Sequence, residues 1–527
     1  MPEVHFRVRW PDGTHQSCTS PSRTIERALC AGASYPVGEF LRRATSALEA
    51  GSERVRARYG FACTAAAAEI DGLRVRAAEH PDGHVTVETM YREALREPPP
   101  ALSGHVPVVI VGGGQAGLSM SWCLSARDVE HVVLERHEIA SSWRRQRWDS
   151  FCLVTPNWQC RLPGHPYAGN DPDGFMVKDQ ILQYLDDYVA SFAPPVVEGV
   201  AVESVTQSPH GTFVVETNVG TLTADQVVLA VGGYHVPTTP RMAERLPSTV
   251  TQLHSSRYRS PATLPDGAVL VVGSGQSGAQ IAEDLHLEGR TVHLAVGSAP
   301  RVARTYRGRD VVAWLQDMGR YDMAIADHPE GLRARKEANH YVTGRDGGRD
   351  IDLRRFATEG MHLHGRLTDI TAPELSFAGD LPKNLDLADA TDDRIKDTID
   401  AWIAAHGVDA DEEPRYVPCW DPPAAADRSA RLDLAAAGIT SVVWATGFRS
   451  DWSWVKVPAF DGTGYPTHHR GVTAIRGLSV IGLPWLHTWG SGRFAGIARD
   501  ADHLASHVAA TIGAPARRSA APVRLAG

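Results

Sequence analysis

The chain has 527 residues and a mass of 57.1 kDa, more than one ordinary core organises, so several domains are expected. Its shares of hydrophobic (43%) and charged (22%) residues are those of a folded globular protein and exclude a disordered or collagen-like chain. The 53 basic and 62 acidic residues give a net charge of −9, which does not favour a nucleic-acid partner. No basic segment followed by an apolar one opens the chain, and no apolar run approaches the ~20 residues of a membrane span. We therefore expect a cytoplasmic protein with neither a nucleic-acid nor a membrane partner.

The cysteines and histidines do not indicate a metal site. The seven cysteines are scattered and contain no Cys-x-x-Cys pair, so free thiols are expected rather than a redox dithiol or a zinc knuckle. Glu359, His362 and His364 are spaced like ligands, but no further strong ligand lies near them. No metal is predicted.

Residues 1–97 are predicted to form a separate small α+β module. Val4 to Trp10 alternates with period two, residues 37–59 have helical spacing, and Val85 to Val87 indicates a closing strand. Three prolines then begin a linker, predicted over 98–104. At the other end, the Ala-, Arg- and Pro-rich residues 513–527 are predicted to be a disordered tail.

A first nucleotide-binding fingerprint follows the linker. The apolar run 106–111 is typical of a buried parallel strand, and a G-x-G-x-x-G sequence comes directly after it. In this pattern the glycines allow a tight turn, close approach of a pyrophosphate and close packing of the next helix. A second strand, 131–134, leads to an acid that can accept the hydroxyls of an adenine ribose. The residues predicted to bind this dinucleotide are Gly112, Gly114, Gln115, Ala116, Gly117, Glu135 and Arg136.

The fingerprint then recurs after the apolar run 268–272. Its next strand, 292–295, ends without an acid, and four arginines follow at 301, 304, 307 and 309. A missing carboxylate removes repulsion and a nearby arginine can bind a 2′-phosphate, so NADPH is predicted over NADH. The alternative is that these arginines lie in a solvated loop. The residues predicted to bind NADPH are Gly273, Gly275, Gln276, Ser277, Gly278, Ser298, Arg301 and Arg304.

Two fingerprints in one chain imply two cofactors, most simply FAD at the first site and NADPH at the second. The predicted fold is α/β, with two Rossmann-like domains and the small N-terminal module. The FAD-binding domain is expected in two parts, 105–240 and 438–512, with the NADPH-binding domain inserted over 241–437. Residues 305–435 exceed what a minimal nucleotide domain needs and are expected to build the substrate side. The acidic residues Asp392, Asp393, Asp397 and Asp400 of this insertion are predicted to form a solvated helical face.

Over residues 104–510 the sequence resembles the class B flavin-containing monooxygenases. Trp143 stands where these proteins have a Gly-Gly-x-Trp turn, and residues 151–158 resemble their segment beneath the isoalloxazine. Residues 445–449, with Thr446 and Gly447, resemble their return into the flavin domain. Gly482 falls in a segment that resembles their strand closing over the ribityl chain of the flavin, and Gly496 in one that resembles the start of their last helix, aimed at the isoalloxazine. Among these proteins the sequence is most similar to flavin-dependent oxidoreductases of nitrilase-containing gene clusters associated with cyanide assimilation, and residues 1–97 resemble a small protein from the same clusters.

This resemblance implies an FAD- and NADPH-dependent monooxygenase. NADPH would reduce the flavin, and reaction with O2 would give a C4a-(hydro)peroxyflavin that oxidises a small molecule, with nitrogen-containing compounds among the candidates. Thr155 and Asn157 are the candidate catalytic residues, with turn chemistry around Pro156 as the alternative.

The identifying motif of the monooxygenases is kept only in its second half, as His254, Tyr258 and Arg259, while Ser248 and Val250 replace its Phe and Gly. This departure favours the alternative of an NADPH-dependent flavin reductase or dehydrogenase with a non-oxygen acceptor. A protein partner for residues 1–97 and a homo-oligomer are both left open, as is a scaffold protein with relic nucleotide sites.

Overall fold

The computed structural model describes residues 4–22, 24–29, 33–59, 64–92, 99–247, 249–336, 339–424 and 428–512. The predicted disordered tail and Ser248 lie outside these residues. The chain divides into two compact units, Met1–Pro99 and Pro100–Gly527, and each is described by itself.

The first unit is an antiparallel sheet with two long helices against one face. Strand β1 alternates between buried and exposed residues, and Val4, Phe6 and Val8 share one apolar core with Phe40 and Leu48 of the longest helix. That helix spans the residues for which helical spacing predicts one. The sheet has the order β2-β1-β4-β3. Its elements are β1 Val4–Arg9, β2 His15–Ser20, α1 Thr24–Ala28, β3 Ser34–Pro36, α2 Val37–Tyr59, α3 Thr64–Glu79 and β4 His84–Arg92.

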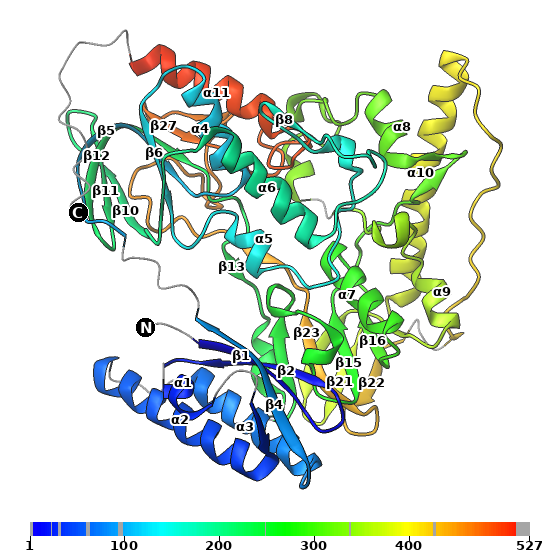
Figure 1. Ribbon diagram of the computed structural model, residues 1–527. Coiled ribbons are helices and arrows are strands. Elements are labelled where there is room, and N and C mark those ends of the chain that lie inside the picture. The colour runs from blue at the N-terminus through cyan, green and yellow to red at the C-terminus, as the bar shows by residue number, and fades with distance from the viewer. Residues whose placement is uncertain are drawn as a thin grey trace. The chain divides into compact units, whose positions relative to one another are not determined.

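The second unit contains two sheets, drawn one above the other in Figure 1. The larger follows the order β25-β26-β27-β12-β5-β6-β9, with β11 and β10 added beside β12. Its central strands β27, β12, β5, β6 and β9 are parallel. The strands are β5 Leu102–Val111, β6 His131–Glu135, β9 Val196–Glu198, β10 Val202–Gln207, β11 Phe213–Thr217, β12 Gly220–Leu229, β25 His468–His469, β26 Val472–Thr473 and β27 Leu478–Val480.

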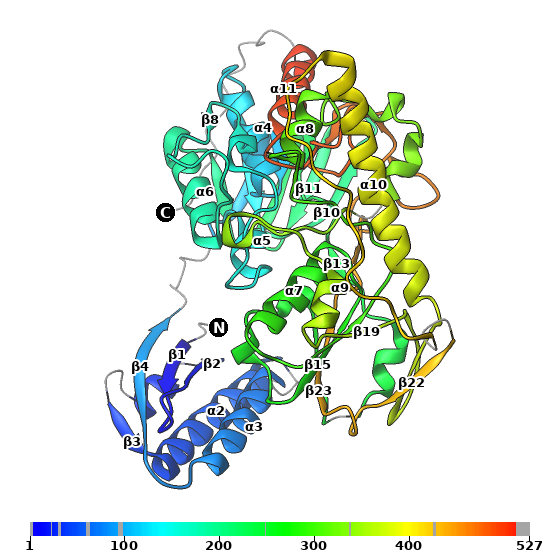
Figure 2. The same ribbon diagram turned by 90° about the vertical axis from the view of Figure 1, so that its right-hand side faces the viewer.

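Helices cover one face of this larger sheet, as Figures 1 and 2 show. They are α4 Gln115–Ser125, α6 Lys178–Phe192 and α11 Ile497–Ile512, whose apolar residues form one core with Val108 and Ile110 of β5. The opposite face packs against β10, β11 and the segment around Trp452 and Val457. The part of β5 from Val106 to Val111 therefore lies between two apolar cores, which explains its apolar sequence.

The smaller sheet is entirely parallel, with the order β14-β23-β15-β16-β19. Its strands are β14 Thr251–His254, β15 Ala268–Val272, β16 Val292–Ala295, β19 His362–His364 and β23 Ile439–Trp444. Helix α7, Gln276–Leu287, crosses from β15 to β16 and packs on one face, while β20 Leu367–Thr371 and β21 Glu374–Phe377 cover the other. Two parallel sheets with βαβ units confirm the predicted α/β fold with two Rossmann-like domains.

The insertion between β16 and β23 is mostly helix and loop. Its largest element, α10 Leu381–His406, extends along one side of the second unit in Figure 2. The other elements of the insertion are β17 Thr305–Tyr306, β18 Arg309–Asp310, α8 Val311–Asp317, α9 Leu353–Thr358 and β22 Ala430–Asp433.

Short elements outside the insertion connect the main parts of the second unit. They are α5 Ser141–Arg145, β7 Arg161–Leu162, β8 His165–Pro166, β13 Val236–Pro237 and β24 Phe448–Arg449.

Two sheet strands begin or end away from the predicted domain boundaries. Strand β5 already begins at Leu102, inside the predicted linker, because the Leu102 amide donates to the Val219 carbonyl (3.0 Å). Strand β23 lies in the smaller sheet, between β14 and β15, although the predicted boundary at 438 assigns it to the FAD-binding part. The chain therefore returns to the larger sheet after Trp444.

Candidate cofactor-binding sites

The first fingerprint forms a close-packed turn between β5 and α4. Gly112 has a φ of +111°, and a Cβ added there would lie 2.7 Å from the carbonyl oxygen of Ala230. A Cβ added to Gly117 would lie 1.9 Å from the carbonyl oxygen of Gly112. No larger residue fits either position, because strand and helix backbones are already in contact there. Ala116 of this turn is buried.

Gly114 differs from its neighbours because space surrounds it. A Cβ added to Gly114 would meet no heavy atom of the described residues within 4 Å. It is the N-cap residue of α4, and within the described chain no side chain caps the helix. The first-turn amides are therefore free to bind an anion at the positive end of the helix dipole. These features fit a dinucleotide pyrophosphate.

Glu135 ends β6 beside this turn. Its Oε2 accepts from the Gly113 amide (2.7 Å) and its Oε1 from the His137 amide (2.9 Å). Each oxygen keeps acceptor capacity for a ribose hydroxyl, so the predicted role fits. The neighbouring Arg136 is exposed.

The second fingerprint has the same design. Gly273 has a φ of +104°, and a Cβ on Gly278 would lie 1.8 Å from the Gly273 carbonyl oxygen. Gly275 is the N-cap of α7, and a Cβ there would meet nothing in the described chain within 4 Å. The Gln276 side chain donates to the Val342 carbonyl (2.8 Å) of the insertion, while Ser277 is exposed.

The C-terminal segment returns to the first fingerprint through Gln115. The side-chain amide of Gln115 donates through its nitrogen to the Gly492 carbonyl (2.8 Å) and accepts through its oxygen from the Trp143 indole (2.7 Å). Gly482 also lies against this turn, since its added Cβ would be 2.6 Å from that of Ala116. At Gly496 an added Cβ would clash with the backbone of Gly490 (2.5 Å). The structure thus brings Gln115, Trp143 and Gly482 together at the first site.

Thr446 and Gly447 lie at the crossover between the sheets rather than beside a fingerprint glycine. The Thr446 hydroxyl donates to the Thr238 carbonyl, and β24 pairs with β13 just beyond it. The Gly447 carbonyl accepts from the Thr238 amide (2.9 Å) and lies 2.9 Å from Nε2 of His254. These contacts position the two connections between the domains.

Arg301 and Arg304 are buried and already paired with carboxylates. Both are 3% exposed. Arg301 forms ion pairs with Asp389 (2.6 Å) and Asp392 (3.3 Å) of α10, and Arg304 with Asp310 (2.8 Å). The geometry favours a structural role, and 2′-phosphate binding by these two residues stays a prediction. Ser298, closer to the end of β16, is exposed.

Replacing Arg301 by glutamine is expected to lower the free energy of unfolding by about 2 kcal/mol, because Asp389 and Asp392 would each lose one of their two cationic partners and keep only Arg354 and Lys396. The matched control is Arg309→Gln, whose partially exposed pair with Asp317 contributes about 1 kcal/mol or less. Denaturant unfolding and the ratio of kcat/KM for NADPH and NADH would be measured on both variants. A lost preference for NADPH with unchanged stability would instead support the cofactor-binding role.

The two candidate catalytic residues differ in their surroundings. The Asn157 side chain is buried, donates to the Asp171 carbonyl (2.9 Å) and accepts from the Met176 amide (2.7 Å). These bonds fix the loop that returns to α6 and favour the structural alternative. Thr155 is partly buried. The catalytic role of both residues stays a prediction.

A buried acidic pair on α7 is absent from the sequence-based predictions. Asp284 accepts from Ser150 (2.5 Å), Tyr258 (2.6 Å) and Arg345 (2.7 Å), which come from three separate segments. Glu283 is 2% exposed and pairs with Arg349 (3.1 Å). Burial raises the pKa of Glu283 to about 7. The only sequence signal for their burial is the apolar residues that surround both acids in α7.

The raised pKa of Glu283 predicts a pH-dependent stability. Between about pH 4.5 and pH 7 the folded chain binds the Glu283 proton more tightly than the unfolded chain, so stability falls as pH rises through this range. Glu283→Gln does not titrate. We expect its advantage in unfolding free energy to grow across this range to about 3 kcal/mol. Urea unfolding of both proteins at several pH values measures it, and parallel curves would contradict it.

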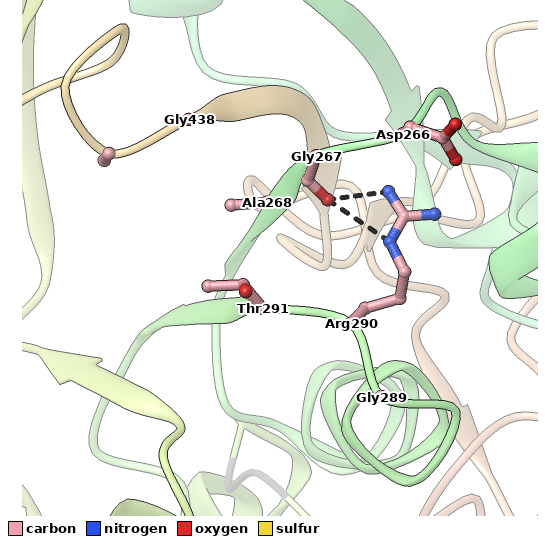
Figure 3. Close-up of a pocket in the computed structure, with 8 residues that line it drawn as sticks. Asp266, Gly267, Ala268, Gly289, Arg290, Thr291 and Gly438 are labelled. Atoms are coloured by element: carbon pink, nitrogen blue, oxygen red, sulfur yellow. Dashed lines mark hydrogen bonds between the residues drawn. The ribbon is translucent and has the colours of Figure 1, made fainter.

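A pocket of about 410 Å3 lies away from both fingerprints, at the amino ends of β15, β16 and β23 (Figure 3). Its Arg290 donates to the Gly267 carbonyl (2.8 Å) and to the Pro261 carbonyl (3.1 Å). The nucleotide-binding glycines follow the carboxyl ends of these strands, so this pocket is not the cofactor site.

Among the described residues, no group of three or more His, Cys, Asp or Glu side chains could hold a metal ion. None of the helices in the described ranges combines the length and apolar character of a membrane span.

Comparisons with known proteins agree with this geometry. Residues 5–90 match the family model of the nitrogen starvation-induced protein NitG, and residues 109–321 match that of the pyridine nucleotide-disulphide oxidoreductases. The uncharacterized oxidoreductase CzcO-like of Geobacillus kaustophilus (strain HTA426) is 31% identical over 407 residues, 76% of this chain and 98% of that protein. The probable indole-3-pyruvate monooxygenase YUCCA4 of Arabidopsis thaliana is 32% identical over 196 residues, 37% of this chain and 47% of that protein.

A solved flavin monooxygenase of Stenotrophomonas maltophilia, a double mutant, shares the fold. It has a TM-score of 0.53 and 20% identity, and the match covers 78% of this chain and all of that one. Fold and site together define a flavoprotein oxidoreductase similar to the class B monooxygenases, as predicted, with two sites whose geometry fits dinucleotide cofactors. The chain belongs to the CzcO-like oxidoreductases and carries a NitG module at its N-terminal end.

Proposed function

We propose that this protein is an NADPH-dependent monooxygenase that uses FAD and O2 to oxidise a small organic molecule. One observation carries the proposal: two glycine turns of one design, each with free space at its second glycine, lie on two sheets joined by the β13–β24 pair. FAD at the first turn would supply the redox chemistry, and the chain would orient the two cofactors. The partial similarity to an indole-3-pyruvate monooxygenase supports oxygen as the acceptor.

NADPH is favoured over NADH by the end of β16. This strand ends at Ala295, and Val296 and Gly297 follow, so no carboxylate stands where NAD-binding domains accept a ribose 2′-hydroxyl. Arg301 and Arg304 already have carboxylate partners, so either of them would have to bind the 2′-phosphate in addition to its ion pair.

A nitrogen-containing substrate is the finer proposal. It rests on the NitG module, whose family is described as induced by nitrogen starvation. We also keep the proposals that this module binds a protein partner, that the chain forms a homo-oligomer and that the protein acts in the cytoplasm.

The second candidate is a flavin reductase or dehydrogenase with a non-oxygen acceptor, which the incomplete monooxygenase motif favours. An internal dithiol is a poor acceptor, because the sequence has no Cys-x-x-Cys pair and Cys152 and Cys160 are free and buried.

Isotope incorporation separates the two candidates. The purified protein would oxidise NADPH under 18O2 with a panel of small amines, nitriles and thioethers, followed by mass spectrometry of the products. A monooxygenase is expected to place one 18O atom in a product and to consume one NADPH per product. NADPH consumption that ends in hydrogen peroxide for every compound, or that proceeds without O2 when a dye is supplied, would favour the reductase.

A further inference from the structure

Two partly buried arginines near the first cofactor site have no carboxylate within ion-pair distance among the described residues. Arg147 follows α5, and its Nη1 donates to the Gln146 carbonyl (3.2 Å). Its guanidinium lies 4.9 Å from the ring centroid of Trp143 and 5.4 Å from that of Phe151. Burial lowers its pKa. An arginine has five N–H donors, so most of its hydrogen-bonding capacity remains.

Arg493 lies in the segment that directly precedes α11. Its two Nη atoms donate to the Trp489 carbonyl and to Oδ1 of Asn339 (2.6 Å). The guanidinium stacks on the Trp489 ring at 3.7 Å from its centroid. Burial lowers the pKa of Arg493 to about 10. Within the described residues neither Arg493 nor Arg147 has a carboxylate within ion-pair distance.

The segments that carry the two arginines meet at an aromatic layer formed by Trp143 and Phe494. Trp143, beneath Arg147, stacks on Phe494, the neighbour of Arg493, with 5.4 Å between centroids and an angle of 18°. Tyr234 lies close enough to both guanidinium groups to affect the pKa of each, and it is 55% exposed. Trp143 also donates to Gln115 of the first fingerprint, so this layer adjoins the FAD site.

The rest of the chain shows how it neutralises buried arginines. Arg301, Arg304 and Arg354 are each 3% exposed, and each is paired with at least one aspartate. A guanidinium that is partly removed from water without a counter-charge is costly, and a bound anion removes that cost. We propose that Arg147 and Arg493 form an oxyanion-binding site beside the flavin that receives the carboxylate of an anionic substrate.

Two sources could supply the oxyanion, a substrate carboxylate or a cofactor phosphate. The α4 N-terminus, with its open space at Gly114, already offers a site for a cofactor phosphate. Arg493, in contrast, is bonded to Asn339 of the insertion, and its Trp489 packs 4.4 Å from the ring of Tyr321, also of the insertion. The insertion is additional to the nucleotide folds, which favours the substrate. The inference rests on the proposed function in taking the flavin side as the place of substrate oxidation.

Anion titrations of the FAD-loaded, full-length protein test the site. Benzoate and acetate, their amides, and inorganic phosphate would be added at constant ionic strength while the flavin absorbance is recorded. We expect benzoate to perturb the flavin spectrum of the wild type. Benzamide should bind more weakly than benzoate by a factor of about ten or more. Arg147→Gln and Arg493→Gln should weaken benzoate binding about tenfold each, whereas Arg161→Gln, at an exposed arginine stacked on Trp158, should leave it unchanged.

Two further measurements on each variant, its FAD content and its dissociation constant for NADPH, distinguish a substrate carboxylate from a cofactor phosphate as the bound oxyanion. Loss of FAD or weaker NADPH binding, with benzoate binding unaffected, would assign the arginines to a cofactor phosphate and overturn the substrate role. If the glutamine variants do not fold, Arg147→Lys and Arg493→Lys keep the charge but lose the bidentate fork, and weaker benzoate binding is still expected. Equal binding of benzoate and benzamide by the wild type overturns the anion site. The titration needs neither NADPH nor O2, so its result is independent of whether oxygen is the acceptor.

Discussion

Replacing Gly114 by valine is expected to abolish FAD loading without disturbing the fold. Gly114 has φ −80° and ψ −177°, an extended conformation that valine adopts readily. No heavy atom of the described residues lies within 4 Å of the added Cβ, so the side chain would enter the space left for the pyrophosphate. Absorbance of the purified protein at flavin and protein wavelengths measures the loading, which we expect to fall about tenfold or more. Circular dichroism checks the fold.

Gly275→Val is the matched variant at the second fingerprint, where φ is −66° and the space around the glycine is equally open. We expect this protein to stay yellow but to lose reduction of its flavin by NADPH, while dithionite still reduces it. The pair thus assigns one cofactor to each turn. A yellow Gly114→Val protein, or a colourless Gly275→Val protein, would contradict the assignment.

These two turns could be predicted from the sequence because everything they need is local. The tight turn, the open second glycine and the close approach of helix to strand are all set by residues within one βαβ unit, so spacing alone places Gly112, Gly117, Gly273 and Gly278. Helix α2 was predictable for the same reason, since its apolar spacing matches the face that packs on β1.

The arginine cluster shows why other parts could not be predicted. The partners of Arg301 are Asp389 and Asp392, which come from a helix far along the chain. The sequence alone favours a solvated acidic face, but Asp392 is 0% exposed and also pairs with Lys396 (2.9 Å). The expectation was wrong for Asp392, although Asp397 of the same helix is exposed. A charge pattern on one helix does not reveal which opposite charges the tertiary fold brings to it.

The position of β23 was missed for a related reason. Its apolar sequence fits a central strand of either sheet, and only the pairing of Val442 with Leu270 and Gln252 places it between β14 and β15. Arg147 and Arg493 were likewise hidden, because their significance lies in the carboxylates that the fold does not bring to them.

The largest loss of stability is expected from Asp284→Ala. The carboxylate of Asp284 is buried on α7 and joins Ser150 of the larger sheet's domain, Tyr258 before β15, and Arg345 of the insertion. Alanine would leave the Arg345 charge without its 2.7 Å partner and the Tyr258 hydroxyl without an acceptor in the interior. Breaking a buried pair of this kind costs about 3–5 kcal/mol, whereas Asp284→Asn, which keeps acceptor oxygen for Tyr258, should cost less.

Denaturant unfolding followed by tryptophan fluorescence and by flavin release would measure this loss. The matched control is Asp317→Ala, which removes one exposed ion pair with Arg309 and should cost about 1 kcal/mol or less. Because Asp284 connects segments of both nucleotide domains, flavin release and fluorescence should shift together in Asp284→Ala. If only the unfolding transition seen by tryptophan fluorescence shifted, the hydrogen bonds of Asp284 would stabilise the smaller sheet alone. If neither transition shifted, the three hydrogen bonds would contribute no net stability, and the two domains would be held together instead by apolar contacts such as those of Trp148 with Phe151 and with Tyr258.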